Sequence, residues 1–214
     1  MSKESEIQMR LAVFDFDSTL MDGETLEFLA EQIGIKKEVK EVTDRAMRGE
    51  LDFFESLQYR VSLLKGLKVE TVNQICKSLP VMPGAKEVVS GLKDKGYRVV
   101  CFSGGFKNAT VPFAEKLGLD ADFSNILHSK DGVLTGLVGG EMMFNDSKGE
   151  MLKRLQSVLG ISPDETLVVG DGANDLSMFK YASKRVAFCA KPVLKENANI
   201  IVEDKDLSLI LNLL

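Results

Sequence analysis

Apolar residues follow two different patterns along this chain. In the first, several apolar residues follow one another with few polar interruptions, at 11–14, 97–102, 166–169, 185–189 and 199–202. Such runs are typical of parallel strands that are buried on both faces. In the second, apolar residues recur every three or four positions, as in amphipathic helices, along stretches that end at Gly96, Gly118 and Gly160. Strands that alternate with helices predict an α/β fold with a Rossmann-like parallel sheet at its core.

Two regions depart from this alternation. Residues 22–80 contain no strand-like run and instead carry four short helical patterns, which predict a helical bundle inserted into the α/β core. Residues 126–144 contain β-compatible residues around Asp131-Gly132, a pair that favours a tight turn between two strands. We therefore expect a small β-hairpin, a helical cap at residues 22–80, and a core domain formed by residues 1–21 and 81–214.

The size and the charge of the chain narrow the classes of function. A chain of 214 residues, of which 44% are hydrophobic, can fold as one large domain with a small insertion. Its formal net charge of −5 argues against nucleic acid as a partner, because nucleic-acid binding relies on basic side chains. No apolar run approaches the ~20 residues that a membrane-spanning helix requires. No membrane element is therefore expected, and the sequence carries no signal for an oligomeric state.

The rare residue types limit the chemistry and the compartment. With His128 as the single histidine, catalytic triads that need histidine and zinc sites built on several histidines are largely excluded. The three cysteines, Cys76, Cys101 and Cys189, are widely spaced and odd in number, which predicts buried thiols in a reducing compartment. The N-terminus has acidic residues and no apolar segment, unlike a secretory signal. We expect a cytoplasmic protein.

Acidic residues follow two of the expected strands. Asp15 and Asp17 come directly after the first apolar run, and Asp171 and Asp175 follow the run at 166–169. Ligands of open α/β sheets bind beyond the carboxyl ends of the strands, so these carboxylates are expected to converge. Clustered carboxylate oxygens favour a hard cation, here Mg²⁺. A calcium-binding EF-hand loop is excluded, because leucine occupies both its glycine position and its final acidic position.

Two further motifs fit a phosphate group. Ser103, Gly104 and Gly105 follow the second expected strand, where small residues let backbone amides approach an anion. Lys148 precedes a helix and can supply a positive charge to a phosphoryl group. Together with the carboxylates, these residues predict metal-assisted phosphoryl transfer through a carboxylate nucleophile.

The motifs occur in the order that is typical of one superfamily. DFDST at 15–19, SGG at 103–105, Lys148 and GDGAND at 170–175 resemble the four motifs of the haloacid dehalogenase superfamily. The segments SLLKGL, SGGF, KDGVLTG, GDGANDLSMF and AFCAKP resemble, more narrowly, the phosphoserine phosphatase family. The resemblance runs from about Leu11 to the end of the chain. It implies hydrolysis of O-phosphoserine to serine and phosphate, the last step of serine biosynthesis.

The resemblance also implies roles for the residues of the core. Asp15 would attack phosphorus and form an aspartyl-phosphate, and Asp17 would act as general acid and then as general base. Mg²⁺ would be bound by Asp15, the backbone carbonyl of Asp17 and Asp171, with Asp175 supporting them from behind. The phosphoryl group would be bound by Ser103, Gly104 and Lys148, and Asn174 would line the site.

In the cap, the resemblance implies contacts with a small phosphorylated amino acid. Glu24 would face the substrate ammonium and Arg60 its carboxylate, while Met47 and Phe53 would shield the site from water. Families of this kind open the cap for exchange and close it for chemistry. The alternative interpretation places Glu24 and Arg60 on a solvated helix face and Met47 and Phe53 in the core of a helical bundle, and from the residues alone Glu24 and Arg60 do not stand out among the charged residues of the cap.

Three alternatives remain at this stage. The same site could act on another small phosphomonoester, such as a sugar phosphate or a nucleotide, or transfer the phosphoryl group to an alcohol. The chain could be a non-catalytic protein that is phosphorylated on Asp15, although such a protein has no need of an acid/base at Asp17. A catalytically inactive binding module is the third, and the intact set of motifs argues against it.

Overall fold

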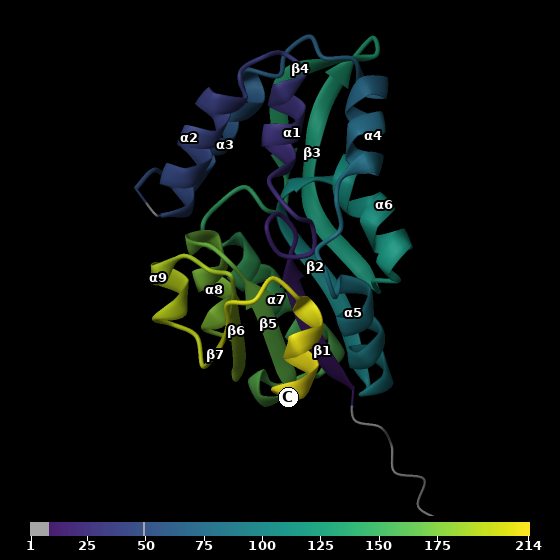
Figure 1. Ribbon diagram of the computed structural model, residues 1–214, viewed down its shortest axis with the longest axis vertical. Coiled ribbons are helices and arrows are strands. Elements are labelled where there is room, and N and C mark those ends of the chain that lie inside the picture. Colours follow the sequence, from purple (N-terminus) through teal and green to yellow (C-terminus); the bar gives the residue numbers. More distant parts are fainter. Residues whose placement is uncertain (1–8, 49) are drawn as a thin grey trace, which may run out of the picture.

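The central element is a seven-stranded sheet, seen in a computed structural model that describes residues 9–48 and 50–214 except for the side chain of Met47 (Figure 1). Its strand order is β4-β3-β2-β1-β5-β6-β7. The strands are β1 (Arg10–Asp15), β2 (Tyr97–Phe106), β3 (Ala121–Lys130), β4 (Val133–Gly140), β5 (Thr166–Gly170), β6 (Lys184–Phe188) and β7 (Ile200–Val202). All neighbouring strands are parallel except β3 and β4, which confirms the expected α/β fold.

Strand β1 lies at the centre of the sheet and contributes to two hydrophobic cores. It pairs with β2 on one side and β5 on the other. Its alternate residues Ala12 and Phe14 belong to one core cluster, whereas Leu11 and Val13 belong to a second. A strand that is buried on both faces needs an uninterrupted apolar run, which is the pattern at 11–14.

Helices cover both faces of the sheet. Residues of α5, α6 and the C-terminal 3₁₀ helix pack in the first cluster, and residues of α7, α8 and α9 pack in the second. Their bounds are α5 (Ala85–Asp94), α6 (Lys107–Leu117), α7 (Ser147–Leu159), α8 (Leu176–Phe179), α9 (Pro192–Lys195), and the 3₁₀ helices η1 (Pro163–Glu165), η2 (Ala173–Asp175) and η3 (Leu207–Asn212).

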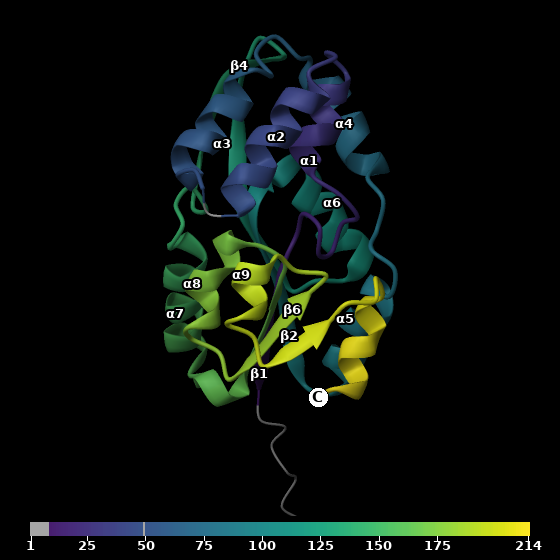
Figure 2. The same cartoon turned by 60° about the vertical axis from the view of Figure 1, so that its left-hand side comes forward.

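Four more helices lie beyond the carboxyl end of β1, at the top of Figure 1 and Figure 2. They are α1 (Thr25–Glu31), α2 (Lys36–Met47), α3 (Phe53–Ser62) and α4 (Val69–Ser78), all within the segment expected to form the cap. Their apolar residues, among them Leu29, Val39, Leu57 and Val72, belong to the same core cluster as Phe14. These helices are therefore packed against the α/β part through a shared hydrophobic core.

The antiparallel pair β3–β4 is larger than the small hairpin expected at 126–144. Strand β3 starts at Ala121 in register with Val100 of β2, so the pair extends the main sheet to its edge. The tip of this hairpin is bonded to the connection between α3 and α4. Leu134 exchanges backbone hydrogen bonds with Gly66 (2.9 Å) and Leu67 (2.8 Å). These bonds attach the connection between α3 and α4 to the edge strand β4 of the sheet.

Two further expectations concern the cysteines and the membrane. Cys76 and Cys101 are buried, but Cys189 is exposed, so the expectation of three buried thiols was wrong for Cys189. Cys189 follows the last residue of β6, where the chain leaves the sheet. No helix within residues 9–48 and 50–214 is long and apolar enough to cross a membrane.

Candidate active site

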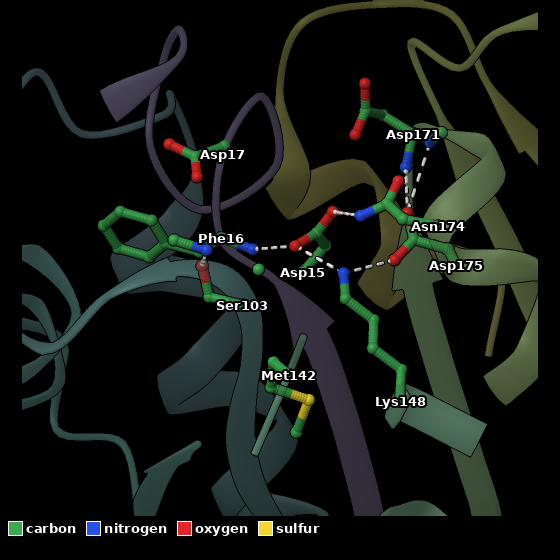
Figure 3. A network of polar contacts seen from close by, with 12 residues as sticks. Asp15, Phe16, Asp17, Ser103, Met142, Lys148, Asp171, Asn174 and Asp175 are labelled. Carbon is green, nitrogen blue, oxygen red and sulfur yellow. Dashed lines mark hydrogen bonds and ion pairs between the residues drawn. The ribbon is translucent and has the colours of Figure 1, made fainter. Parts of the chain in front are cut away.

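Asp15 lies at the centre of a buried network of polar side chains (Figure 3). It is the last residue of β1 and is only 2% exposed. Its Oδ1 accepts a hydrogen bond from the backbone amide of Phe16 (2.6 Å) and pairs with Nζ of Lys148 (2.7 Å). Its Oδ2 accepts a hydrogen bond from Nδ2 of Asn174 (3.3 Å). Three donors therefore fix the orientation of this carboxylate.

Lys148 links the two acid-bearing strand ends. It lies in the first turn of α7, and its Nζ contacts Oδ1 of Asp15 at 2.7 Å and Oδ1 of Asp175 at 2.6 Å. Burial alone would lower the pKa of Lys148, but the two carboxylates raise it above its ordinary value. The other oxygen of Asp175 accepts the backbone amides of Asp171 (3.0 Å) and Gly172 (3.2 Å). Lys148 is thus a permanent buried cation.

One positive charge does not balance the carboxylates around it. Ligand atoms of Asp15, Asp171 and Asp175 lie within 4.8 Å of one another. Burial and then the charge of Asp15 raise the pKa of Asp171 well above its ordinary value, and the same causes raise that of Asp175 to about 7. The buried Oδ1 of Asp171 has no hydrogen-bond partner among the described residues.

These carboxylates have the properties of a site for a divalent cation. A buried oxygen without a donor costs free energy unless a cation or water satisfies it. A divalent cation with oxygen ligands would satisfy Asp171 and would reverse the upward pKa shifts, because it stabilises the charged carboxylates. The residues present therefore fit a hard divalent cation.

Asp17 is held apart from this cluster by the first residue of α1. Its Oδ1 accepts hydrogen bonds from the backbone amide (2.7 Å) and the hydroxyl (2.6 Å) of Thr25. Its Oδ2 lies 2.9 Å from the position that a Cβ on Gly105 would occupy, so only glycine leaves it room there. Burial raises the pKa of Asp17 to about 6, and the bonds from Thr25 limit the shift. Asp17 can therefore exchange a proton near neutral pH.

The end of β2 offers hydrogen-bond donors beside these acids. Ser103 is fully buried, and its Oγ accepts the backbone amide of Gly105 at 2.9 Å, which leaves the hydroxyl hydrogen for an anion. A Cβ on Gly104 would lie only 2.5 Å from Cζ of Phe53 in α3. The ring of Phe53 therefore covers Gly104, which allows this approach because it has no side chain.

A small cavity of about 30 Å³ lies between the helical region and the ends of the strands. Its core side is lined by Asp15, Asp17, Gly104, Gly105 and Asn174, and its other side by Glu24, Thr25, Phe53, Leu57 and Arg60. The cavity thus has carboxylates and donors on one side, and one acid and one base on the other.

Neither of the two ionisable residues on the helical side contacts an oppositely charged side chain among the described residues. Arg60 is 4% exposed and forms no ion pair within the described part of the chain. Burial lowers the pKa of Arg60; a guanidinium is in practice always protonated in proteins, so Arg60 stays charged. Glu24 accepts a hydrogen bond from Oγ of Ser18 (2.6 Å), and burial, followed by the charge of Asp17, raises its pKa to about 8. Arg60, a buried charge without a counter-charge among the described residues, calls for an anionic ligand, whereas a cationic ligand beside Glu24 would favour the ionised form of that acid.

Comparison with known proteins gives a consistent result. A family model described as haloacid dehalogenase-like hydrolase matches residues 9–183. A phosphoserine phosphatase of Wolinella succinogenes is 63% identical over 203 residues, which cover 95% of this chain and 98% of that protein. A phosphoserine phosphatase of Methanocaldococcus jannaschii is 48% identical over 96% of this chain and 98% of that protein. The chain belongs to the phosphoserine phosphatase family.

Solved structures of this family have the same fold. One described as a phospho-aspartyl intermediate analogue of phosphoserine phosphatase superposes with a TM-score of 0.94 at 48% identity, covering 96% of this chain and 99% of that chain. A substrate-bound phosphoserine phosphatase complex also has a TM-score of 0.94, at 47% identity over 97% and 99% of the two chains. The match extends over the helical region and the sheet alike.

Seven of the expected site residues line this one cavity: Asp15, Asp17, Glu24, Phe53, Arg60, Gly104 and Asn174. Lys148, Asp171 and Asp175 do not line it but belong to the polar network around Asp15 (Figure 3), and the hydroxyl of Ser103 is bonded to Gly105. The side chain of Met47 lies outside the described residues.

The sequence did not single out the residues that hold the charged groups in place. Thr25 holds Asp17, Ser18 holds Glu24, and Thr43 contacts Arg60. Ser18 stands in the DFDST segment and has a positive φ of 57°, but neither its neighbours nor its spacing indicates a bond to Glu24. Threonines are common in amphipathic helices, so nothing in the sequence marks Thr25 or Thr43.

Proposed function

We propose that this protein is a Mg²⁺-dependent phosphoserine phosphatase that hydrolyses O-phosphoserine to serine and inorganic phosphate, the last step of serine biosynthesis. One observation carries the proposal. Arg60, a buried guanidinium that forms no ion pair with any described residue, lines the same cavity as Asp15, the oriented carboxylate at the end of β1. A phosphomonoester that also carries a carboxylate satisfies both groups at once.

In the first step, an oxygen of Asp15 forms a bond to phosphorus, and the bond from phosphorus to the serine oxygen breaks. Asp17, whose pKa is raised by burial to about 6, donates its proton to the leaving serine oxygen. In the second step, the carboxylate of Asp17 takes a proton from water, and the water oxygen forms a bond to phosphorus. The bond from phosphorus to the oxygen of Asp15 breaks, and inorganic phosphate is the product.

The phosphoryl group carries negative charge throughout these steps. The hydroxyl of Ser103, the backbone amide of Gly104 and the ammonium of Lys148 are the donors proposed to bind it. Asn174 holds Oδ2 of Asp15 and lines the cavity. Asp15, the backbone carbonyl of Asp17 and Asp171 would hold Mg²⁺, with Asp175 behind them. When bound, the ion supplies positive charge that neutralises the carboxylates and the phosphoryl oxygens.

The other side of the cavity would select an amino acid. Arg60 would bind the substrate carboxylate through two parallel hydrogen bonds, and Glu24 would accept hydrogen bonds from the ammonium. An ammonium next to Glu24 also favours the ionised form of that acid and so lowers its raised pKa. Residues 22–80 would form the cap, in which Met47 and Phe53 exclude water from the reaction.

The decisive experiment measures phosphate release with and without Mg²⁺ from O-phosphoserine, O-phosphothreonine and glucose 6-phosphate. We expect kcat/KM for O-phosphoserine to exceed that for the sugar phosphate about 100-fold or more, because the sugar leaves Arg60 and Glu24 unpaired. Better turnover of the sugar phosphate would overturn the substrate assignment. A stable phospho-protein with negligible turnover would instead favour a phosphoacceptor, and a product that depends on an added alcohol would favour phosphotransfer.

A further inference from the structure

Arg60 is held by a residue of a neighbouring helix that has no role in the function proposed above. Thr43 lies in α2 and is 1% exposed. Its Oγ1 accepts a hydrogen bond from Nη1 of Arg60 at 2.8 Å, which joins α2 to α3. This is the one side-chain to side-chain hydrogen bond of Arg60 within residues 9–48 and 50–214.

Backbone carbonyl groups fix the geometry of the hydrogen bond between Thr43 and Arg60. The hydroxyl of Thr43 donates its hydrogen to the carbonyl oxygen of Val39, one turn earlier, at 2.9 Å. With that hydrogen engaged, a lone pair of Oγ1 is directed at the guanidinium. Nε of Arg60 in turn donates to the carbonyl oxygen of Ser56 at 3.0 Å.

These two contacts leave part of the guanidinium free for a ligand. A guanidinium has five N–H groups in a rigid plane. Two of them are held by Thr43 and Ser56, and three have no partner in the described part of the chain. Since Arg60 lines the cavity, its fixed plane presents donors to whatever binds there. Two fixed contacts also remove most of the rotamer freedom that a long side chain would otherwise lose on binding.

We propose that Thr43 is a positioning residue that sets the preference of this enzyme for substrates with a carboxylate. It acts by fixing the plane of Arg60 before the substrate binds. The proposal rests on the proposed function, in which Arg60 binds the substrate carboxylate. Under this proposal, α2 contributes to substrate specificity, although Thr43 itself is not among the residues that line the cavity.

The test compares two substrates that differ in one group. O-Phosphoserine carries a carboxylate, whereas phosphoethanolamine has the same phosphate and ammonium without it. Thr43→Val removes the acceptor but keeps the size and the branching of the side chain. We expect this variant to raise KM for O-phosphoserine about 10-fold, since a hydrogen bond to a charged group is lost. KM for phosphoethanolamine and both values of kcat should change less than about 2-fold.

Three controls separate positioning from a structural effect. Thr43→Ser keeps the hydroxyl and should restore KM for O-phosphoserine to within about 2-fold of the wild type. Thr71→Val makes the same change in α4, outside the contacts of Arg60, and should be silent. In an Arg60→Ala background, Thr43→Val should have no further effect on O-phosphoserine, because both changes remove the same interaction.

The outcomes are distinct. Equal losses on both substrates for Thr43→Val, or a Thr43→Ser variant as impaired as Thr43→Val, would overturn the positioning role. If Thr43→Val does not fold, as judged by thermal unfolding, Thr43→Ala with the same two substrates replaces it. If the wild-type enzyme does not prefer O-phosphoserine to phosphoethanolamine, the proposed function fails on its own, before any Thr43 variant is compared.

Discussion

The two sides of the active-site cavity are built in different ways. On the core side, Lys148 forms ion pairs with Asp15 at 2.7 Å and with Asp175 at 2.6 Å. Each of these three residues lies at the end of a strand or the start of a helix. On the side of the proposed cap, called the cap side below, the hydrogen-bond partners of Glu24 and Arg60 among the described residues are all neutral. On the core side the nucleophile is therefore already paired with a cation before a substrate binds, and what remains unsatisfied is the oxygen of Asp171 that a metal ion would bind, whereas Arg60 on the cap side has no counter-charge among the described residues.

In the function proposed here, this difference separates the residues that carry out the chemistry from those that select the substrate. Phosphoryl transfer needs a nucleophile and positive charge in fixed places, so preorganised ion pairs on a rigid sheet suit it. Selection needs groups whose charges are satisfied by the correct substrate and left unpaired by the wrong one. Variants of the core side should therefore affect all phosphomonoesters, and variants of the cap side should affect mainly O-phosphoserine.

The largest effect is expected on the core side, from Asp15→Asn. This change removes the proposed nucleophile and keeps the shape of the side chain, so turnover of every substrate should fall by about 10⁴-fold or more. The melting temperature should stay the same or rise, because one of several clustered negative charges is lost. Phosphate release and thermal unfolding test both parts. Substantial remaining activity would refute a nucleophilic role.

Lys148→Met should come next. It removes the buried cation and leaves Asp15 and Asp175 without a partner, which should lower kcat about 10³-fold for all substrates. The free energy of unfolding of the metal-free protein should fall by about 3 kcal/mol at pH 8. Denaturant titration measures the second effect. Lys153→Met on the exposed side of the same helix is the control and should change neither quantity. Equal losses in the two variants would contradict the assignment.

On the cap side, Arg60→Ala should lower kcat/KM for O-phosphoserine about 100-fold, because the substrate carboxylate loses its two charge-assisted hydrogen bonds. The same variant should change kcat/KM for phosphoethanolamine less than about 3-fold. Steady-state kinetics with O-phosphoserine and phosphoethanolamine measure both changes in kcat/KM. Equal losses would show that Arg60 acts structurally or through general electrostatics, and would remove the contrast between the two sides.

Gly104→Ala tests the contact where the two sides meet. The new Cβ would lie 2.5 Å from Cζ of Phe53, so the ring must move away from β2. We expect kcat/KM for every substrate to fall about 10-fold, because the seal against water is lost. Phe53→Leu, which shortens that side chain, should restore part of the activity of Gly104→Ala. Gly139→Ala, where the added Cβ would meet nothing within 4 Å, is the matched control.

The smallest effect concerns pH. Burial, followed by the charge of Asp17, raises the pKa of Glu24 from 4.5 to about 8. The folded protein therefore holds this proton more tightly than the unfolded chain does. That contribution to stability is complete below pH 4.5 and is lost as the pH rises towards 8.

The melting temperature of the metal-free protein should accordingly fall between pH 5 and pH 8. Glu24→Gln, which cannot titrate, should make this fall shallower by a few degrees. Glu31→Gln, with a side chain that is 56% exposed, should leave it unchanged. An unaltered slope for Glu24→Gln would show that Glu24 is not held unpaired in the cavity.

The core of the fold was predictable because most of its strands have a local signature. Apolar runs buried on both faces marked β1, β2, β5, β6 and β7, and glycines marked the ends of helices. The start of β3 at Ala121 was missed, because Ala121–Phe123 is short, half-buried and interrupted by Asp122. Such a strand depends on pairing with β2, which only the folded chain provides.

The residues of the site also differ in how far the sequence alone predicts them. Asp15, Asp171 and Lys148 stand at strand and helix ends, and that topology alone gathers them at one edge of the sheet. Glu24 and Arg60 are two of many charged residues in four amphipathic helices, and only resemblance to a family selected them. Their partners Ser18 and Thr43 have no marker in the sequence, because these hydrogen bonds depend on how the turn after β1 folds back towards Glu24 and on how α2 packs against α3.

The sequence by itself determined where the apolar strands lie along the chain. It also determined that acids follow two of these strands at their carboxyl ends, and hence the charge of the site. Local periodicity and strand-end chemistry are properties of short segments, so they can be read without the fold. Only the tertiary structure decided which cap charges remain unpaired, that Phe53 covers Gly104, and that Thr43 fixes Arg60. These facts depend on distances between segments far apart in the chain, which only the packing of the cap on the sheet sets.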